Sequence, residues 1–512
     1  MDKVRDFLNS LNAEGMGSLM QQDIADRFTK YINNAPLFFD RGNLDEHYTY
    51  TFLQGVYNIL RENKYPAGVN YDNLIVLLEN IIASGLTDKF SVEKRDRDMY
   101  NAWLANWNAV FNSAADVLKK LLGEDKSEEL INFVDLRERL LAIIKNFLSF
   151  PEPDLEDNIR ENGTDPFGTA INSVRGKAFQ SLIFFAQKDD KKFAKTDKVK
   201  ISDDVKVIYE ELLNREDTYA VMFEYGHYLS FFYYRDRDWI KGLFGKIFPQ
   251  EPEKHDLLIA SLEGYFCNNL YGELFADLNN IYELTIKMTS DQYTKRRYFK
   301  DVDEGLATHI ALAFTYFPTV NLESPLFQLF WGTLNPKRQK EFISFVGRHV
   351  ISREKAKENI TKDKIDLEKL KGFWDWAIDN ISDKEVLSGF GFWMNTKEDV
   401  LDKIWVSERA YKTLEKSNGL IEWEYGLMKS IIELATLAPE NTLKILNAYL
   451  DSRYISKSLD GSEYSIYVDK EIFDVLNILY KNTSTKDGVY QLIDQLLPVG
   501  NGMFWKLKDI IK

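Results

Sequence analysis

Apolar residues recur every three or four positions over long stretches of this chain, which predicts amphipathic α-helices. Between Glu273 and Met288 the apolar positions fall on one helical stripe, and the polar positions Asp277, Asn280 and Glu283 lie off it. The stripe comprises Leu274, Phe275, Leu278, Ile281, Tyr282 and Ile286. We therefore expect a helix here that turns this stripe toward the core.

Residues 421–450 predict two helices separated by a turn. Ala438-Pro439-Glu440-Asn441 interrupts the pattern, and the proline ends the first helix and opens the second. The second helix presents Leu443, Leu446 and Leu450 on one face. A helix, a Pro-containing turn and a helix form the unit that HEAT-like and TPR-like solenoids stack, although no strict repeat period runs through the chain. The predicted fold is all-α, an irregular α-solenoid of stacked helix pairs.

Three polar segments divide this helical pattern. Ser149–Gly163 reads as a Pro-bearing loop, Lys188–Lys200 carries six lysines and three aspartates and reads as an exposed connector, and Arg353–Lys371 reads as a solvated helix or linker. From these we predict helical regions at residues 1–150, 163–350 and 365–512. The only segments with strand character flank Asp460-Gly461, which predicts one small β-hairpin near residues 454–468.

Composition supports helices and excludes several classes of protein. The chain has only 12 Pro and 27 Gly in 512 residues, below average usage of about 5% and about 7%, which opposes an all-β fold. A net charge of −15 opposes non-specific binding to nucleic acid, because phosphate binding needs a basic surface. The single cysteine, Cys267, excludes an internal disulfide and any multi-Cys metal site, and it suits a reducing cytosol.

The sequence shows neither a signal peptide nor a membrane-spanning segment. Met1–Asp6 does not have the basic-then-apolar layout of a signal peptide, and the longest apolar stretch, Leu306–Phe317, is too short to span a bilayer. We expect a soluble, cytoplasmic protein without a membrane partner.

A search for catalytic motifs finds none that fits. The chain has no phosphate-binding loop, no H-E-x-x-H, no G-x-S-x-G and no G-x-G-x-x-G, and its five histidines are scattered. Arg-Asp-Arg-Asp occurs at Arg95–Asp98 and Arg235–Asp238, where the arginines would compete with a cation for the aspartates, so we expect ion pairs. Cys267 reads as a small apolar residue of a helix. We predict no catalytic residue, no metal and no cofactor.

An enzyme is the alternative interpretation. Tryptophan, tyrosine and paired carboxylates build the clefts of glycoside hydrolases, so an all-helical, carbohydrate-active hydrolase with an acidic, aromatic-lined cleft is the second hypothesis. The 80 acidic residues make some carboxylate pair inevitable, however. We expect Trp374-Asp375-Trp376 and Gly391-Phe392-Trp393 to fill the core instead.

The most distinctive segment is Thr164–Phe179. Thr164 or Asp165 can cap a helix that Pro166 opens, and an apolar stripe then follows at Ile171, Val174, Ala178 and Leu182. Asn172, Ser173 and Gly176 are small or polar residues that let another helix approach closely, and Arg175 is placed to bridge to that helix.

This segment begins an ordered set of short motifs between about Asn70 and Leu450. The later members are Tyr225-Gly226-His227, Asp236–Trp239, Ile247-Phe248-Pro249, Glu263-Gly264-Tyr265, Glu304–His309, Phe345–Arg348, Phe373–Trp376 and Leu387–Trp393. The set resembles the C-terminal helical regions of large bacterial anti-phage defence proteins, which join a STAND-type or sirtuin-like N-terminal module to a HEAT/TPR-like array. No single motif is diagnostic; the order of the motifs carries the resemblance.

The resemblance implies a sensor of a phage structural or packaging protein that signals to an effector NTPase, nuclease or sirtuin-like subunit. This sequence contains neither N-terminal module, so no nuclease, NADase or ATPase activity carries over. We therefore expect a protein-binding scaffold. For each tryptophan among the candidate contact residues, a position in the core is the alternative. The candidates are Asn172, Arg175, Trp103, Trp107, Trp239 and Trp393.

Overall fold

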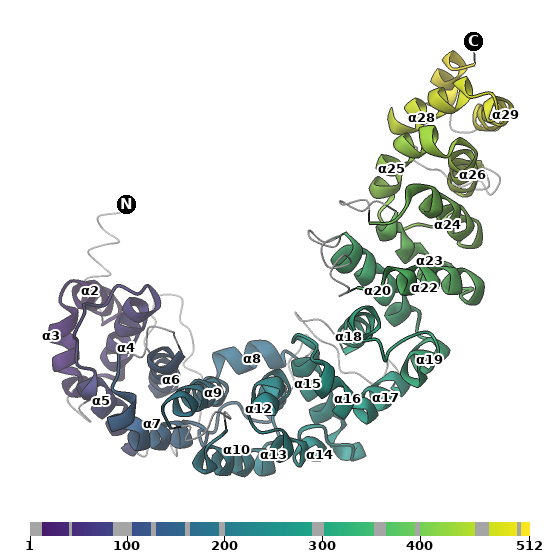
Figure 1. Ribbon diagram of the computed structural model, residues 1–512. Helices are drawn as coiled ribbons and strands as arrows, with labels where there is room; N and C mark the ends of the chain where they lie inside the picture. The colour runs from purple at the N-terminus through teal and green to yellow at the C-terminus, as the bar shows by residue number, and fades with distance from the viewer. Residues whose placement is uncertain are drawn as a thin grey trace, which may run out of the picture. The chain divides into compact units, whose positions relative to one another are not determined.

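The computed structural model of the chain is built of helices (Figure 1). It describes residues 13–39, 44–84, 105–123, 130–158, 164–193, 200–288, 302–352, 365–394, 400–455, 470–498 and 503–511. No strand occurs in these ranges, which confirms the predicted all-α class. The described residues divide into two compact units, residues 13–268 and residues 269–511.

The first unit contains these elements: α2 (Ala13–Asp26), α3 (Phe28–Asn33), η1 (Ala35–Phe38), α4 (Glu46–Arg61), α5 (Asp72–Ala83), α6 (Trp107–Gly123), α7 (Phe133–Phe147), η4 (Glu156–Asn158), α8 (Pro166–Asn172), α9 (Val174–Phe193), α10 (Asp203–Arg215), α11 (Tyr219–His227), α12 (Leu229–Arg235), α13 (Arg237–Lys241), α14 (Phe244–Ile247), η5 (Pro252–Lys254) and α15 (His255–Phe266). Alternate helices pack side by side. One row runs from α2 through α4 and α6 to α9, and α3, α5 and α7 form a second row that also reaches α9.

Helices α11 and α15 of the first unit pack with their backbones in contact. A Cβ on Gly226 would lie 1.9 Å from the carbonyl oxygen of Ser261, and a Cβ on Gly264 would lie 2.0 Å from that of Phe223. Each helix therefore places a glycine against the other's backbone. Both helices are buried on all sides over most of their length, because α11 also packs against α8 and α9.

The second unit contains α16 (Gly272–Asp277), α17 (Asn279–Lys287), α18 (Val302–Tyr316), α19 (Pro325–Gly332), α20 (Pro336–Phe345), η7 (Val346–Ile351), α22 (Leu367–Asn380), α23 (Lys384–Ser388), η8 (Gly389–Trp393), α24 (Lys403–Lys416), α25 (Glu424–Leu437), α26 (Pro439–Leu450), η9 (Asp451–Ile455), α28 (Lys470–Lys481), α29 (Lys486–Leu496) and η10 (Met503–Asp509). Alternate helices again pack together. α24 lies between α22 and α26, which in turn reaches α29, and α25 packs against η8 and α28.

An aromatic cluster fills the core of the second unit. The ring of Phe373 lies 5.1 Å from Phe342 and 5.4 Å from Trp331, measured between centroids, and Trp374 stacks on Phe390 at 4.8 Å. Trp374 and Trp393 are fully buried, which confirms that these two tryptophans fill the core. Their indole N–H groups are satisfied, since Trp374 donates to Thr413 Oγ1 and Trp393 to the Ile343 carbonyl.

A buried ion pair joins three helices of the same unit. Arg338, 2% exposed, donates from Nε to Asp303 Oδ1 at 2.5 Å, and Asp303 on α18 is 1% exposed. The two Nη groups donate to the carbonyls of Ile286 at 2.8 Å and Met288 at 2.9 Å, at the end of α17. Since every side of the guanidinium has an acceptor, this burial avoids the cost of an unpaired charge.

The predicted helix interruptions are partly right. α25 ends at Leu437 and α26 starts at Pro439 as expected. The stripe between Leu274 and Ile286 is buried, but the helix is broken at Leu278 into α16 and α17. Leu278 has φ −98° and ψ 13°, outside the helical region, while its side chain is fully buried; this corner keeps the whole stripe facing inward.

The helix expected from Pro166 is also broken. Asp165 caps α8 by accepting from the Gly168 N–H at 2.9 Å, but Ser173 is extended and α9 starts afresh at Val174. The break leaves Ile171 exposed and Val174 buried. It folds α8 back onto α9, where a Cβ on Gly176 would lie 2.0 Å from the carbonyl oxygen of Ala170. The close approach predicted for Gly176 is confirmed, and its partner is α8.

The exposed connector predicted from Lys188 onward is wrong for its first residues. Lys188, Asp189 and Asp190 are buried in the last turns of α9. Charge alone suggested solvent, but Asp189 accepts from Arg137 Nε at 2.8 Å and Asp190 from Arg235 Nε at 2.9 Å. Residues 194–199 lie outside the described residues. So does most of the predicted hairpin, residues 456–468, while residues 454 and 455 belong to η9.

Placing a methyl group at the crossing of α11 and α15 should destabilise the first unit. Gly226→Ala or Gly264→Ala forces the two backbones apart, at a cost of about 1–3 kcal/mol or more. Gly245→Ala is the matched control, because nothing lies within 4 Å of its Cβ, and it should be neutral or slightly stabilising. Urea unfolding followed by circular dichroism measures the difference; equal stability of all three variants would contradict this packing.

Removing the carboxylate beside Arg338 should be costly. Asp303→Ala leaves a buried guanidinium without its counter-charge and is expected to lower the free energy of unfolding by about 3–5 kcal/mol. The double variant Asp303→Leu/Arg338→Met should recover most of that loss, because no charge is then buried. A single variant as stable as the original chain in urea unfolding would disprove the role of the pair.

Candidate functional site

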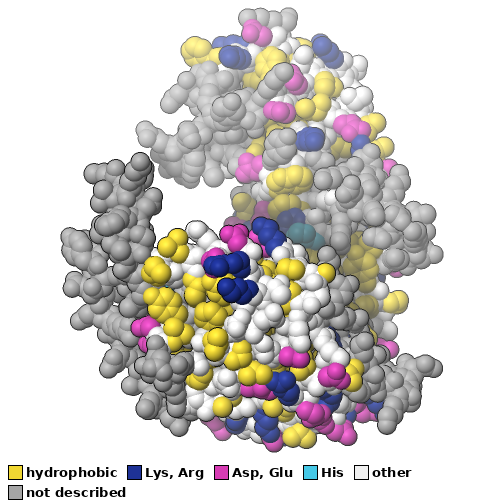
Figure 2. All heavy atoms as spheres, turned by 90° about the vertical axis from the view of Figure 1, so that its left-hand side faces the viewer, with side chains coloured by type: hydrophobic (Ala, Val, Ile, Leu, Met, Phe, Trp, Pro, Cys, Tyr) yellow, Lys and Arg dark blue, Asp and Glu magenta, His cyan; other side chains and the backbone are white. Residues whose placement is uncertain are grey.

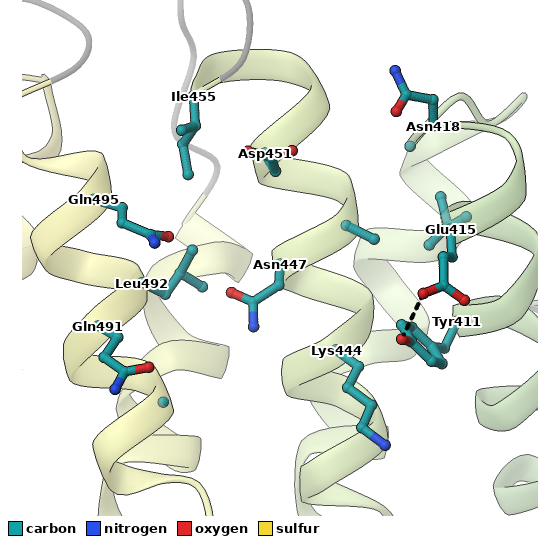
Figure 3. A pocket seen from close by; sticks show the side chains of 14 residues that line it. Tyr411, Glu415, Asn418, Lys444, Asn447, Asp451, Ile455, Gln491, Leu492 and Gln495 are labelled. Carbon is teal, nitrogen blue, oxygen red and sulfur yellow. Dashed lines mark hydrogen bonds between the residues drawn. The ribbon is translucent and has the colours of Figure 1, made fainter.

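A groove in the second unit opens between α24, α26 and α29 (Figure 3). Its volume is about 530 Å³. Most of its lining is polar, with four amides (Asn418, Asn447, Gln491 and Gln495) and three charged side chains (Glu415, Lys444 and Asp451). Small and apolar residues, among them Ala448, Gly488 and Leu492, complete the walls.

Helix α26 contributes the central wall through the spacing of its polar residues. Lys444, Asn447 and Asp451 are separated by three and four positions and so share one side of the helix. Ile445 and Leu446, on the other side, are fully buried. The amphipathic pattern that anchors α26 in the core therefore also determines which side chains reach the groove.

The two flanking helices approach α26 through glycines. A Cβ on Gly488 of α29 would lie 2.6 Å from Leu443 Cδ2. After α24, Asn418 and Gly419 both have positive φ, of 56° and 74°, and a Cβ on Gly419 would lie 2.6 Å from the Ala448 carbonyl oxygen. α24 packs along α26, whereas α29 touches α26 at few points, so the space between α26 and α29 is open.

The amides of the groove have unused hydrogen-bonding capacity. Among the described residues, no group bonds to the side chains of Asn418, Asn447, Gln491 or Gln495. Figure 3 shows Asn447 pointing from α26, and Gln491 and Gln495 pointing from α29, into the same gap. Each amide offers a donor and an acceptor. The gap is therefore lined on both walls by groups that can bind a polar partner.

The part of the groove between α24 and α26 contains three ionisable groups, those of Tyr411, Glu415 and Lys444. Tyr411 Oη donates to Glu415 Oε1 at 3.1 Å, and this hydrogen bond, with partial burial, raises the pKa of Tyr411. The Lys444 ammonium lies 5.4 Å from the centroid of the Tyr411 ring. The lining has one positive side chain, Lys444, and two negative ones, Glu415 and Asp451. The resulting net charge of −1 disfavours a phosphate ligand.

The largest pKa shifts occur in the first unit, away from this groove. Burial raises the pKa of the Glu224 carboxyl to about 8, although Gln180 Nε2 donates to its Oε1 at 2.8 Å. Burial lowers the pKa of the Lys177 ammonium, which Asp116 opposes through an ion pair at 2.6 Å. These groups lie between packed helices and bond to neighbouring side chains, which is the arrangement of a structural polar network.

Asn172 and Arg175, predicted as contact residues, take part in local packing. Asn172 is exposed and donates to the carbonyl of Gly168 at 2.7 Å. Arg175 donates to the Pro153 carbonyl and lies 3.4 Å from Glu216 Oε1. It thus connects α9 to the loop that precedes α8 and to the loop before α11.

The predicted tryptophans that the structure describes are Trp107, Trp239 and Trp393. Trp103 lies outside the described residues, and Trp107 is partly buried with its ring 5.6 Å from Phe39. Trp239 donates from its indole N–H to Glu210 Oε1 at 2.7 Å. Trp393 is fully buried. None of the five predicted residues that the structure describes lines the groove.

The remaining sequence candidates for chemistry form no centre in the described part of the chain. No group of three or more His, Cys, Asp and Glu among those residues could hold a metal ion. The expected ion pairing of the second Arg-Asp-Arg-Asp is confirmed, since Arg235 binds Asp190 and Asp236 binds Lys206 at 2.6 Å; residues 95–98 lie outside the described residues. Cys267 is half-buried at the end of α15.

On the face shown in Figure 2, basic and acidic side chains are interspersed.

Sequence reasoning missed the groove because its residues belong to no catalytic motif. One signal was present in the pattern of α26: the prediction concerned only the apolar face, Leu443, Leu446 and Leu450. The adjacent face holds Lys444 and Asn447 in register, and the amides of α29 repeat at a spacing of four. Such a pattern is common on solvated helices, so only the neighbouring helices make it distinctive.

Replacing Glu224 with glutamine should change how stability depends on pH. The folded-state pKa of about 8 lies above the ordinary value of 4.5, so the stabilisation by the protonated carboxyl is complete below pH 4.5 and is lost as the pH rises through 8. Glu224→Gln keeps an acceptor for Gln180 and does not ionise. Its free energy of unfolding, relative to that of the original chain, should therefore rise by up to about 1.4 kcal/mol per pH unit over this range. Urea unfolding at pH 6 to 9 measures this, with exposed Glu253→Gln as the control; parallel pH profiles for all three proteins would contradict it.

Comparison with known proteins adds no homologue to this picture. No family model matches the sequence, and no curated protein matches it. Within the part of the chain that is described, no helix combines the length and apolar character needed to cross a membrane.

Proposed function

We propose that this chain is a protein-binding helical scaffold whose helices stack as an irregular α-solenoid. The packing of alternate helices in each unit supports this, because in a solenoid each layer contacts mainly its neighbours. Solenoids of this kind bind partners on the extended surface that their stacked helices form.

The observation that carries the proposal is the open, amide-lined groove between α24, α26 and α29. Sites for small molecules are mostly enclosed and apolar, with few polar groups. This groove is open and polar, and unpartnered amides line both sides of the gap. Those properties favour a polypeptide, which presents many donors and acceptors along its length.

We further propose that the partner is a phage structural or packaging protein and that the chain signals in the cytoplasm to an effector NTPase, nuclease or sirtuin-like subunit. The support is the ordered motif set described above. Two of its members, Tyr225-Gly226-His227 and Glu263-Gly264-Tyr265, contain the glycines that pack α11 against α15. At these positions the resemblance concerns packing, so it supports a shared helical architecture more directly than a shared partner.

Co-expression of the tagged full-length chain with individual phage capsid, portal and terminase proteins tests the partner. One of them should co-elute in stoichiometric amount. Lys444→Glu in the groove should weaken that complex at least several-fold. Lys429→Glu is the same charge reversal at an exposed position of α25 and should leave the complex unchanged. If no phage protein co-elutes and deletion of the gene leaves phage sensitivity unchanged, the sensor proposal is wrong.

A further inference from the structure

We propose that the groove between α26 and α29 binds a partner segment in extended conformation by hydrogen bonding to its main chain. This inference rests on the proposed protein-binding function and specifies what part of the partner is recognised. It follows from the position, spacing and free hydrogen-bonding capacity of Asn447, Gln491 and Gln495.

The spacing of the two glutamines matches the repeat of an extended chain. Gln491 and Gln495 are four residues apart on α29, which corresponds to about 6 Å along the helix axis. An extended polypeptide presents equivalent main-chain groups along one edge every two residues, about 6.6–6.8 Å. A segment lying along α29 would therefore offer successive peptide groups of the same edge to the two side chains.

Asn447 supplies the opposite wall. Its side chain points from α26 into the gap toward α29 (Figure 3). A primary amide carries both an N–H donor and a C=O acceptor, as each peptide group of the segment does, so one amide can bind a residue's N–H and C=O together. An extended segment between the helices would be held at both edges.

Some amides on the helices of this chain are bound to their own helix, and those of the groove are not. Asn146 donates to the carbonyl of Ala142, and Asn380 to that of Trp376, each four residues earlier in its own helix. In contrast, Asn447, Gln491 and Gln495 make no such bond. Their donors are directed away from their own helices and are available to a ligand.

Amides face the gap between α26 and α29, whereas Glu415 and Lys444 lie toward α24. The apolar lining residues of the groove are Leu414, Ala448, Ile455 and Leu492, and Gly488 adds no side chain. Tyr411, the only aromatic residue among the described residues of the lining, has the Lys444 ammonium over its ring, which disfavours stacking of sugar rings or bases there. Recognition through the main chain is the mode that remains for a polypeptide, and it would tolerate many sequences.

Selection of peptides from a displayed random dodecapeptide library on the purified full-length chain tests this mode. Synthetic versions of the enriched peptides, measured by fluorescence anisotropy, should lose at least tenfold in affinity when alternate residues are N-methylated. This loss is expected because each lost main-chain hydrogen bond lowers the affinity about 2- to 12-fold. Alanine substitution at the same positions keeps the main-chain groups and should change the affinity by less than about threefold. No enriched peptide, or no effect of N-methylation, would overturn the inference.

Variants of the chain identify the binding surface. The triple variant Asn447→Ala/Gln491→Ala/Gln495→Ala should bind these peptides at least tenfold more weakly, and Asn477→Ala, an unpartnered amide on neighbouring α28, should bind within twofold of the original chain. All three substitutions are on helix surfaces, so we expect the triple variant to fold. Its melting temperature, compared with that of the original chain, checks this. Unchanged peptide binding by the triple variant would overturn the inference.

The two proposals fail in different ways. A phage protein that co-elutes equally with the original chain and the triple variant would leave the protein-binding function standing and disprove main-chain binding in this groove. Peptide binding that follows the N-methylation pattern, together with no co-eluting phage protein, would support the groove and disprove the phage partner.

Discussion

The backbone contacts at Gly226 and Gly264 determine how closely α11 and α15 can lie in the first unit. With the backbones of α11 and α15 in contact, α11 can also reach α8 and α9, and its residues from Ala220 to Gly226 are all buried. A helix with neighbours on several sides cannot show the usual apolar stripe. It becomes apolar all round, and small residues set its spacing.

Buried charge has a second structural role in both units. Arg338 with Asp303, Lys177 with Asp116 and Arg137 with Asp189 are ion pairs that link different helices. Each pair requires one relative position of its helices, because a displaced partner would leave a charge without compensation. The amides of the groove present the opposite case, since their hydrogen-bonding capacity is left unused by the fold.

Periodicity and turn residues predicted the helical class, the Pro439 boundary and a cap at Thr164 or Asp165, because these depend on residues close in sequence. The breaks at Ser173 and Leu278 could not be predicted in the same way, since tertiary packing bends the chain there while the apolar pattern continues. Burial of Asp189 and Asp190 depends on Arg137 and Arg235, which are remote in sequence. The groove likewise requires three helices to meet, and no local pattern specifies which helices do so.

The aromatic core of the second unit gives the protein an uneven optical signature. Seven of the ten tryptophans follow residue 300, and Trp331, Trp374, Trp376 and Trp393 belong to one cluster of rings with centroids 4.8–6.3 Å from their neighbours. Rings so close exchange excitation energy and couple their transitions. The intrinsic emission and the near-ultraviolet dichroism of the whole chain are therefore dominated by the second unit, and that unit also contains the groove.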